Sequence, residues 1–373
     1  MLDLEVSKSH GISMVNRANS GILDGCIVRR IVRSNGNILN VAISVVFLVA
    51  FLCAQPSGRA ADSRRCSAHT EASVPGASGK GQRVLSFPQD YSLGEIIIQS
   101  YPPSSAGREL RGAARGKIIV PAGKFVKFIP AKRFYSNPSI VNTIAEDGID
   151  SIELSASSMD DREDGLCDRA LSYVGHLKGL IELNLDRSDA TDAGAMHAGE
   201  LPNLQKISAY STAVEGKCFE QFSKLKKLRQ LRLASNRLRD ENLKYLGAAS
   251  GLESIDLIGC NISDAGLKYL ASCTNMTTCT VADNPKITDQ SIRYFCCWKK
   301  LHHLGLRRTS ITAKGISQLK GLPIRAIELP SSNFTKAQLD SFHAALPGSK
   351  FAAPAPLQKK VDSETNTLFA PMH

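Results

Sequence analysis

A motif of about 24 residues recurs eight times between residues 147 and 351, and this regularity leaves few folds open to the chain. Each unit starts with an apolar-x-x-apolar-x-apolar pattern, and the spacings between successive starts are 31, 24, 24, 24, 24, 25 and 23. The starting residues are Ile149, Leu180, Leu204, Leu228, Leu252, Met276, Leu301 and Ile324. A single unit cannot bury its apolar row, so this period predicts a stack of similar units that share one core.

Two polar positions recur as well. Three residues after the last apolar residue of the expected strand, the units carry Ser157, Ser188, Thr212, Asn236, Cys260, Asn284, Thr309 and Ser332. A stacked coil turns a corner at this point, and we expect these side chains to bond its exposed backbone groups.

The second polar position lies three residues before an apolar position with helical spacing, and it holds Asp168, Asp192, Asp240, Asp264 and Asp289. We expect each aspartate to cap the start of its own helix. Ala313 and Lys336 replace this aspartate in the last two units.

The pattern of the unit "LESIDLIGCNISDAGLKYLASC" resembles the leucine-rich-repeat family, whose units read L-x-x-L-x-L-x-x-N/C-x-L and continue into a helix or 3₁₀ turn. The unit is similar to the cysteine-containing subtype, and its length is similar to that of bacterial repeats. The resemblance covers residues 147–351 and is weakest in the third unit, at Ala209 and Gly216. It implies an α/β solenoid, or horseshoe, of about eight units, with a parallel β-sheet on the concave face and short helices on the convex face.

The start of the chain suggests export. A basic region, residues 1–37, precedes the uncharged apolar run "ILNVAISVVFLVAFLCA" at residues 38–54. Because this run has no amphipathic face and a segment poor in apolar residues follows it, we favour a signal peptide or membrane anchor over a buried helix. A basic flank stays in the cytoplasm, so we expect the rest of the chain outside it, periplasmic, secreted or anchored.

The remaining segments flank the repeats. Residues 55–83 are rich in Ser, Gly, Ala and Arg and are interpreted as a flexible linker. Residues 84–146 contain three β-prone runs, and we expect a small β-rich N-terminal cap in which Pro121-Ala122-Gly123 forms a hairpin turn between two of these runs. Residues 352–373 have the composition of a disordered tail.

The net charge of +11 raises the question of nucleic-acid binding. Residues 1–146 hold 18 Lys and Arg against 9 Asp and Glu, whereas residues 147–350 hold 26 against 24. A nearly neutral array is a poor phosphate-binding surface, so we expect no nucleic-acid partner. The basic cluster Lys224, Lys226, Lys227, Arg229, Arg232, Arg237 and Arg239 is interpreted as a solvated face and rim, with an acidic partner as the alternative.

The chain shows no catalytic or metal-binding pattern. Among its ten cysteines, Cys260, Cys273 and Cys279 occupy repeat positions that predict small buried hydrophobes. The stretch "CCWKKLHH" invites a zinc site, but the register puts Cys296 and Cys297 on the convex side and His303 on the concave strand, and it puts Trp298 in the core. Since no phosphate loop or nucleophile elbow is found either, we expect no cofactor, metal, small-molecule substrate or enzymatic activity.

Residues that flank the apolar strand positions point to the concave surface. Tyr and Arg often dominate interface energies, so Tyr210 and Arg232 are the first candidates, with Asp256 beside them. The full predicted partner-binding set is Lys206, Tyr210, Arg232, Asp256 and Arg307. Seven strand spacings and three residues give a strip of roughly 340 Å², below the ~800 Å² of a standard interface, so either binding is weak or the turn loops contribute.

These features favour a non-enzymatic protein-interaction scaffold that binds a protein through its concave face. Two alternatives remain open. A curved polar face with Tyr210 suits a cell-envelope polysaccharide, and cysteine-containing repeats resemble the substrate-recruiting subunits of intracellular ubiquitin-ligase complexes.

Overall fold

The computed structural model describes residues 80–100, 109–155, 165–331 and 333–352. Outside the described residues lie the basic region at 1–37, the apolar run at 38–54 and most of the expected linker. The expected tail, 352–373, lies outside them too, apart from Ala352, which is the last residue of a strand. Within the described ranges, no helix has both the length and the apolar character needed to cross a membrane.

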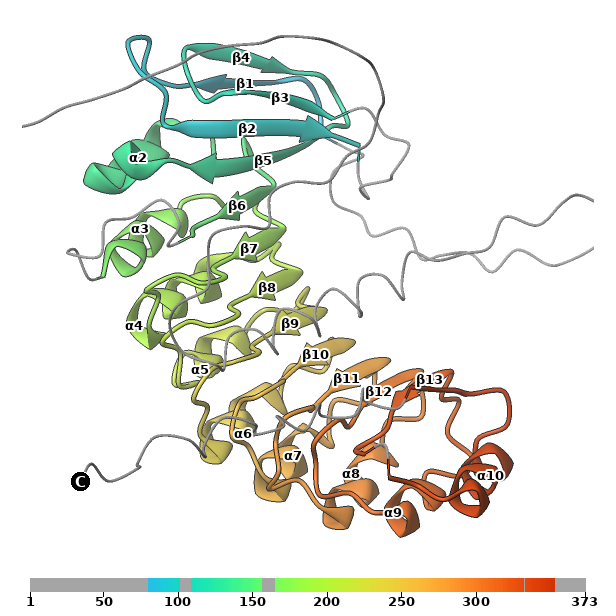
Figure 1. Ribbon diagram of the computed structural model, residues 1–373. Coiled ribbons are helices and arrows are strands. Elements are labelled where there is room, and N and C mark those ends of the chain that lie inside the picture. The colour runs from blue at the N-terminus through green and yellow to red at the C-terminus, as the bar shows by residue number, and fades with distance from the viewer. Residues whose placement is uncertain (1–79, 101–108, 156–164, 332, 353–373) are drawn as a thin grey trace, which may run out of the picture. The chain divides into compact units, whose positions relative to one another are not determined.

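Each repeat unit contributes one three-residue strand to a parallel sheet (Figure 1). In chain order these are β6 (Ser151–Glu153), β7 (Glu182–Asn184), β8 (Lys206–Ser208), β9 (Gln230–Arg232), β10 (Ser254–Asp256), β11 (Thr278–Thr280), β12 (His303–Gly305) and β13 (Ala326–Glu328), and β14 (Lys350–Ala352) closes the array. Equivalent residues of successive units lie side by side, as Ile255 and Cys279 do. The predicted α/β leucine-rich-repeat solenoid is confirmed.

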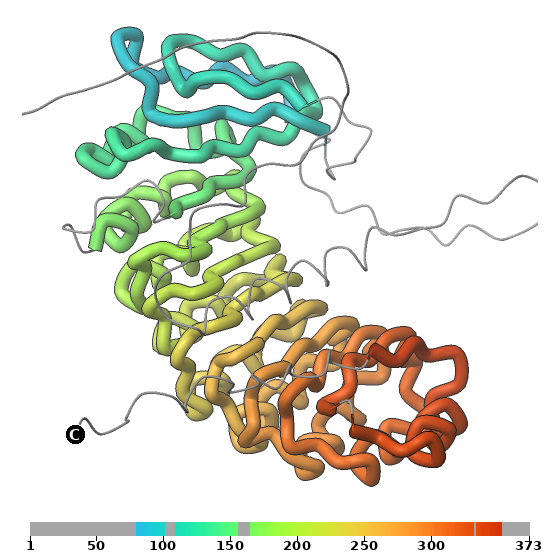
Figure 2. The backbone as a smooth tube through the Cα atoms, viewed as in Figure 1, coloured from blue at the N-terminus to red at the C-terminus, as the bar shows by residue number. Residues whose placement is uncertain are grey.

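Short helices return the chain from one strand to the next, and Figure 2 shows the resulting coils. They are α3 (Leu166–Val174), α4 (Asp192–Ala195), η3 (Met196–Glu200), α5 (Phe219–Phe222), η4 (Asp240–Asn242), α6 (Leu243–Leu246), α7 (Asp264–Leu270), η5 (Asp289–Ser291), α8 (Ile292–Phe295), α9 (Ala313–Ser317) and α10 (Lys336–Ala345). One apolar cluster between helices and sheet runs from Leu85 to Leu346. Trp298 lies in it, fully buried as predicted, and its Nε1 donates to Leu270 O at 3.1 Å.

The polar corner position bonds the backbone as predicted. Asn236 donates through Nδ2 to Ala209 O at 2.6 Å and Leu233 O at 2.8 Å, and its Oδ1 accepts from Thr212 N at 2.8 Å. Asn284 is fully buried and makes the same kind of contacts. Cys260 takes this place with its Sγ 3.0 Å from Leu233 O. Two members of the row, Ser157 and Ser332, lie outside the described residues.

The expectation that the aspartates cap their own helices is wrong. Where the aspartate follows a hydroxyl residue, at Thr191, Ser263 and Thr288, that hydroxyl is the cap: Ser263 Oγ, for example, accepts from Ala265 N at 3.2 Å. The aspartate carboxylate instead reaches the next unit, where Asp240 accepts from Ser263 N at 3.0 Å and from Ser263 Oγ at 2.5 Å. Because the aspartate is the first helical residue in most units, its side chain lies beyond its own cap and beside the neighbour's unsatisfied N–H.

The last unit shows how a missing carboxylate is replaced. Ala313 offers no oxygen to the following helix, so Thr335 N donates instead to Gln338 Oε1 of its own helix at 2.8 Å. Thr335 Oγ1 accepts from Gln338 N in return, which completes a capping box.

The β-rich cap contains β1 (Arg83–Ser86), β2 (Gly94–Gln99), β3 (Leu110–Ala113), β4 (Lys117–Val120) and β5 (Phe125–Pro130), followed by α2 (Lys132–Ser136) and η1 (Pro138–Thr143). The expected hairpin at Pro121-Ala122-Gly123 is wrong: β4 pairs with β1, whereas β5 pairs with β2 and in parallel with β6. Both edges of β5 are therefore occupied, and this pairing joins the cap to the sheet of the repeats.

A buried ion network fastens the cap to the first unit. Asp150 is fully buried and pairs with Lys80 at 2.7 Å and with Arg83 at 2.8 Å, and it also accepts from Val126 N at 2.7 Å. A buried carboxylate without such partners would be strongly destabilising. Residues 80–83, which the sequence assigns to the linker, are thus part of the folded cap.

The aspartates that bond the following unit are called the aspartate ladder. One of them, Asp240, leaves no room for a side chain at Gly266, which lies beside its carboxylate. An alanine at Gly266 should destabilise the chain by about 1–3 kcal/mol, since its Cβ would collide with Asp240 Oδ1 and lie 2.8 Å from Leu243 Cδ1. Helix propensity alone favours alanine over glycine by about 1 kcal/mol. Urea unfolding of Gly266→Ala measures the sign. Gly112→Ala is the control, because no atom lies within 4 Å of its added Cβ; a stabilised Gly266→Ala protein would contradict the ladder.

Candidate functional site

Three of the five predicted partner-binding residues meet on the concave face. Arg232 Nη1 lies 2.9 Å from Asp186 Oδ2, and Arg232 Nε lies 3.4 Å from Asp256 Oδ2. The guanidinium also stands 4.6 Å from the centre of the Tyr210 ring. Asp186, Tyr210, Arg232 and Asp256 are called the Arg232 cluster below.

Asp186 holds this cluster together, although the sequence prediction did not select it. Its Oδ1 accepts from Ser208 Oγ at 2.6 Å and from Tyr210 N at 2.8 Å, while its Oδ2 pairs with Arg232. Asp186 precedes Tyr210 by one repeat length, so both occupy the same register position. That spacing is the signal which could have identified Asp186.

Opposing effects act on the pKa of Asp256 in the Arg232 cluster. Burial raises the pKa of Asp256 above its ordinary value, and the nearby Asp186 carboxylate adds to this effect. Hydrogen bonding from Ile258 N and the charge of Arg232 act in the opposite direction on the same pKa. Asp186 and Asp256 share the guanidinium of Arg232, and these two ion pairs keep its side chain in place.

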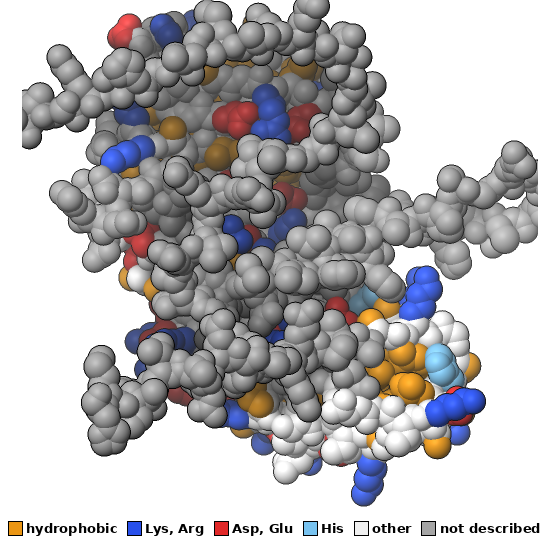
Figure 3. All heavy atoms as spheres, in the orientation of Figure 1, with side chains coloured by type: hydrophobic (Ala, Val, Ile, Leu, Met, Phe, Trp, Pro, Cys, Tyr) orange, Lys and Arg blue, Asp and Glu red, His pale blue; other side chains and the backbone are white. Residues whose placement is uncertain are grey.

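The other two predicted residues lie apart from this cluster. Arg307, after β12, pairs with Asp283 at 2.6 Å, and Asp283 also pairs with Arg308 at 3.0 Å. Burial raises the pKa of the neighbouring Glu328, and the charge of Arg307 partly offsets this rise. Lys206, on β8, is exposed and makes no ion pair with any described residue. On the face shown in Figure 3, acidic and basic side chains lie next to one another.

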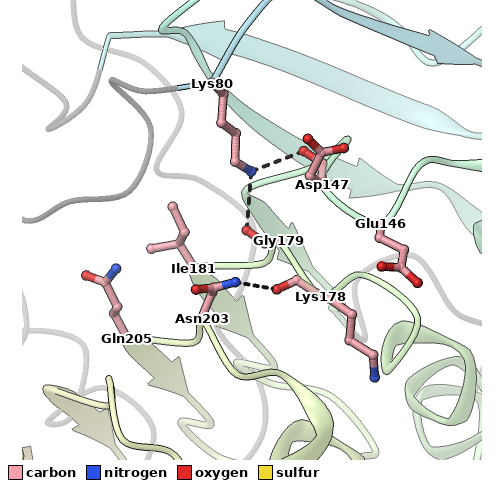
Figure 4. A pocket seen from close by; sticks show the side chains of 8 residues that line it. All are labelled: Lys80, Glu146, Asp147, Lys178, Gly179, Ile181, Asn203 and Gln205. Carbon is pink, nitrogen blue, oxygen red and sulfur yellow. Dashed lines mark hydrogen bonds between the residues drawn. The ribbon is translucent and has the colours of Figure 1, made fainter.

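A small pocket lies at the junction of cap and repeats, at the amino ends of β6 to β8 (Figure 4). Its volume is about 280 Å³, and it is lined by Lys80, Glu146, Asp147, Lys178, Gly179, Ile181, Asn203 and Gln205. Lys80 Nζ donates to Asp147 O and Gly179 O, and Asn203 Nδ2 donates to Lys178 O. The predicted partner-binding residues do not line this pocket.

The basic cluster around Lys224 is partly neutralised. Arg229 pairs with Glu253 at 3.4 Å and Arg239 with Glu215 at 3.2 Å, while Lys227 Nζ donates to Asn203 Oδ1 at 2.6 Å. This arrangement is typical of a solvated rim with local partners.

The seven described cysteines are free thiols. Cys260, Cys273 and Cys279 are buried, as expected for small hydrophobes, and burial raises the pKa of Cys273 to about 11 and that of Cys260 to about 12. These two thiols therefore stay protonated and poorly nucleophilic near neutral pH. Across the described ranges, no group of three or more His, Cys, Asp or Glu side chains could hold a metal ion.

Replacing Arg232 should expose the repulsion between its two carboxylate partners. Arg232→Met is expected to lower the free energy of unfolding by about 1–2 kcal/mol at pH 7. Without the guanidinium the pKa of Asp256, already raised by burial, rises further. An ionised carboxylate with a raised pKa destabilises the folded state above that pKa, and the penalty disappears as the pH falls through it.

The difference in the free energy of unfolding between the wild type and Arg232→Met, called the deficit, should therefore shrink as the pH falls from about 7 to about 4. Urea-unfolding curves measure it. Arg293→Met is the matched control, because Arg293 stacks on Tyr294 on α8 and makes no ion pair with a described residue. An Arg232→Met deficit that is equal at both pH values would contradict the shared-cation account.

Comparison with known proteins gives remote structural neighbours. No model of a protein family and no curated protein matches the chain. Internalin C2 of Listeria monocytogenes is 15% identical, with 59% of this chain and 92% of that chain covered and a TM-score of 0.40. The internalin InlF of the same organism is 14% identical, with 59% and 70% covered and a TM-score of 0.37. TLR13 in its ssRNA13 complex is 16% identical, with 57% and 30% covered and a TM-score of 0.40.

Internalins and TLR13 are leucine-rich-repeat proteins. In the present chain the fold follows directly from the register: equivalent residues pair from β6 to β13, and helices connect successive strands. The described repeats form a leucine-rich-repeat solenoid.

Proposed function

We propose that this chain is a non-enzymatic scaffold that binds a protein partner through the concave face of its repeats, outside the cytoplasm. The observation that carries the proposal is the Arg232 cluster, in which two carboxylates hold the Arg232 side chain beside the Tyr210 ring. Tyr and Arg are over-represented among residues that dominate binding energy.

The cluster suits binding because it is organised before a partner arrives. Ordering a flexible side chain at an interface costs about 0.5–1.5 kcal/mol, and a side chain already held in place avoids most of that cost. Asp186 fixes both the Tyr210 backbone and the Arg232 guanidinium. A partner that contacts the Tyr210 edge and the free side of Arg232 would therefore meet a rigid surface.

The rim of the sheet would supply the area that the strands lack. Arg187, Asp283 and Arg308 follow the carboxyl ends of their strands and have φ values of 58°, 58° and 53°. Such positive values are uncommon for residues with side chains, and they repeat here at equivalent positions. We infer that these charged rim residues extend the concave strip of roughly 340 Å² towards the ~800 Å² of a standard interface.

Charge pairing supports a protein partner over a polyanion. The guanidiniums of Arg232, Arg307 and Arg308 each face an aspartate, whereas nucleic-acid affinity comes mainly from cations that neutralise phosphates. Two guanidiniums also stand near the Tyr210 ring, at 4.6 and 5.6 Å from its centre. A sugar that stacks on this ring would have to displace them, so the polysaccharide alternative is less well supported.

Export rests on residues 38–54, whose uncharged apolar run follows a basic region. We propose that this segment directs the repeats out of the cytoplasm, by cleavage or as an anchor. Fractionation of cells that produce the tagged full chain tests this part, and a cytoplasmic soluble protein would overturn it.

The binding proposal is tested by co-purification with a double variant, Tyr210→Ala with Arg232→Glu. We expect a specific protein partner to be retained by the wild type and its affinity for the variant to fall by about thirtyfold or more, the size of a hot-spot loss.

The matched control is Tyr294→Ala with Arg293→Glu, which removes a similar Tyr–Arg pair from the convex helix α8. Its partner binding should equal that of the wild type, and circular dichroism should show all three proteins folded. Unchanged binding by the concave variant, or equal loss in both variants, would overturn the concave site.

A further inference from the structure

Two histidines and an arginine lie together at the amino ends of β12 and β13. His303 is the first residue of β12, and His302 and Arg325 come directly before β12 and β13. Their backbones are joined, since His302 O accepts from Arg325 N at 2.7 Å and from Ala326 N at 3.1 Å. His302, His303 and Arg325 are called the His–Arg cluster.

The repeat register shows that side chains at this position reach their neighbours. Arg229 and Glu253 occupy the equivalent places before β9 and β10, and their side chains form an ion pair at 3.4 Å. Before β12 and β13 the same two places hold His302 and Arg325. A basic residue therefore stands beside a basic residue in the two places where Arg229 and Glu253 pair opposite charges.

The surroundings of the cluster do not compensate its charge. The neighbours Thr277, directly before β11, and Thr278, the first residue of β11, are uncharged, and on β14 the neighbour is Lys350. The nearest acid on these strands is Glu328, whose pKa responds to Arg307. Within the described part of the chain, no ion pair joins His302, His303 or Arg325 to a carboxylate.

The ionisation of the histidines fits this arrangement. Burial is the main cause that lowers the pKa of His302 and of His303, and the charge of Arg325 lowers both further. A lowered pKa favours the neutral imidazole, and a bound anion would favour the protonated one.

We propose that the His–Arg cluster is a binding site for a phosphate group. A guanidinium presents a planar fork of donors that matches phosphate oxygens, and two protonated imidazoles next to it would supply further N–H donors. A dianion would offset the repulsion among the three basic groups, so binding draws protons onto the histidines. This site lies apart from the Arg232 cluster and does not depend on the proposed protein partner.

The site is tested on the full chain by NMR, with the imidazole proton signals followed against pH with and without inorganic phosphate. The signals of His302 and His303 are assigned with His302→Gln and His303→Gln. Phosphate should raise the pKa of both residues, and the affinity calculated for the phosphate dianion should increase as the pH falls. His197, which pairs with Glu200 on the convex side, is the internal reference, and sodium chloride at equal ionic strength is the salt control.

Arg325→Gln removes the guanidinium from the His–Arg cluster. Because Arg325 is exposed, the substitution leaves the core intact. It should raise the pKa of both histidines in the absence of phosphate and weaken phosphate binding by about two- to fivefold. Arg293→Gln on the convex face should change neither quantity.

An O-phosphoserine amide distinguishes the source of the group. Binding of this ester at least as tight as that of inorganic phosphate would indicate a phosphorylated partner, and binding of inorganic phosphate alone would indicate the free ion. The proposal is overturned if phosphate moves all histidine signals equally, moves neither His302 nor His303, or binds Arg325→Gln as tightly as the wild type.

Discussion

Hydrogen bonds that pass from one unit to the next hold the repeat stack in register. The corner of each coil leaves backbone groups without partners inside their own unit, and neighbouring side chains supply the partners. Asn236 bonds carbonyls on both sides of the junction, and Asp240 bonds the cap of the following helix. Because a buried unpaired backbone group is costly, a unit displaced along the sheet would lose these bonds as well as its apolar contacts. This requirement keeps equivalent residues side by side.

Register is also what builds the candidate sites. Asp186 and Tyr210 are 24 positions apart in sequence and within hydrogen-bonding distance in space. Arg232 reaches Asp186 across an intervening strand, 46 positions away, and reaches Asp256 on the next strand. With strands about 4.8 Å apart, the long arginine side chain spans neighbours that shorter side chains do not. The cluster therefore needs both the repeat spacing and the length of one particular side chain.

The candidate binding residues of the array lie at positions where the units differ from one another. Core and corner positions are similar from unit to unit because every unit solves the same packing problem. Positions facing solvent are free to vary, and they hold opposite charges at Arg229 and Glu253 but two basic residues, a histidine and an arginine, at His302 and Arg325. A solenoid thus converts the linear order of charged residues into a surface pattern, with one step per unit.

The sequence by itself determined the solenoid, the corner ladder, the buried cysteines and the place of Trp298, because burial demands apolar residues at a fixed spacing and that spacing is visible in the chain. It also brought Tyr210, Arg232 and Asp256 to one face. Only the tertiary structure decided that Asp240 serves the next helix, that β4 pairs with β1, and that Asp186 organises the cluster. A period specifies which residues are neighbours, whereas the direction in which a polar side chain turns depends on which nearby group lacks a partner, and that is settled only in three dimensions.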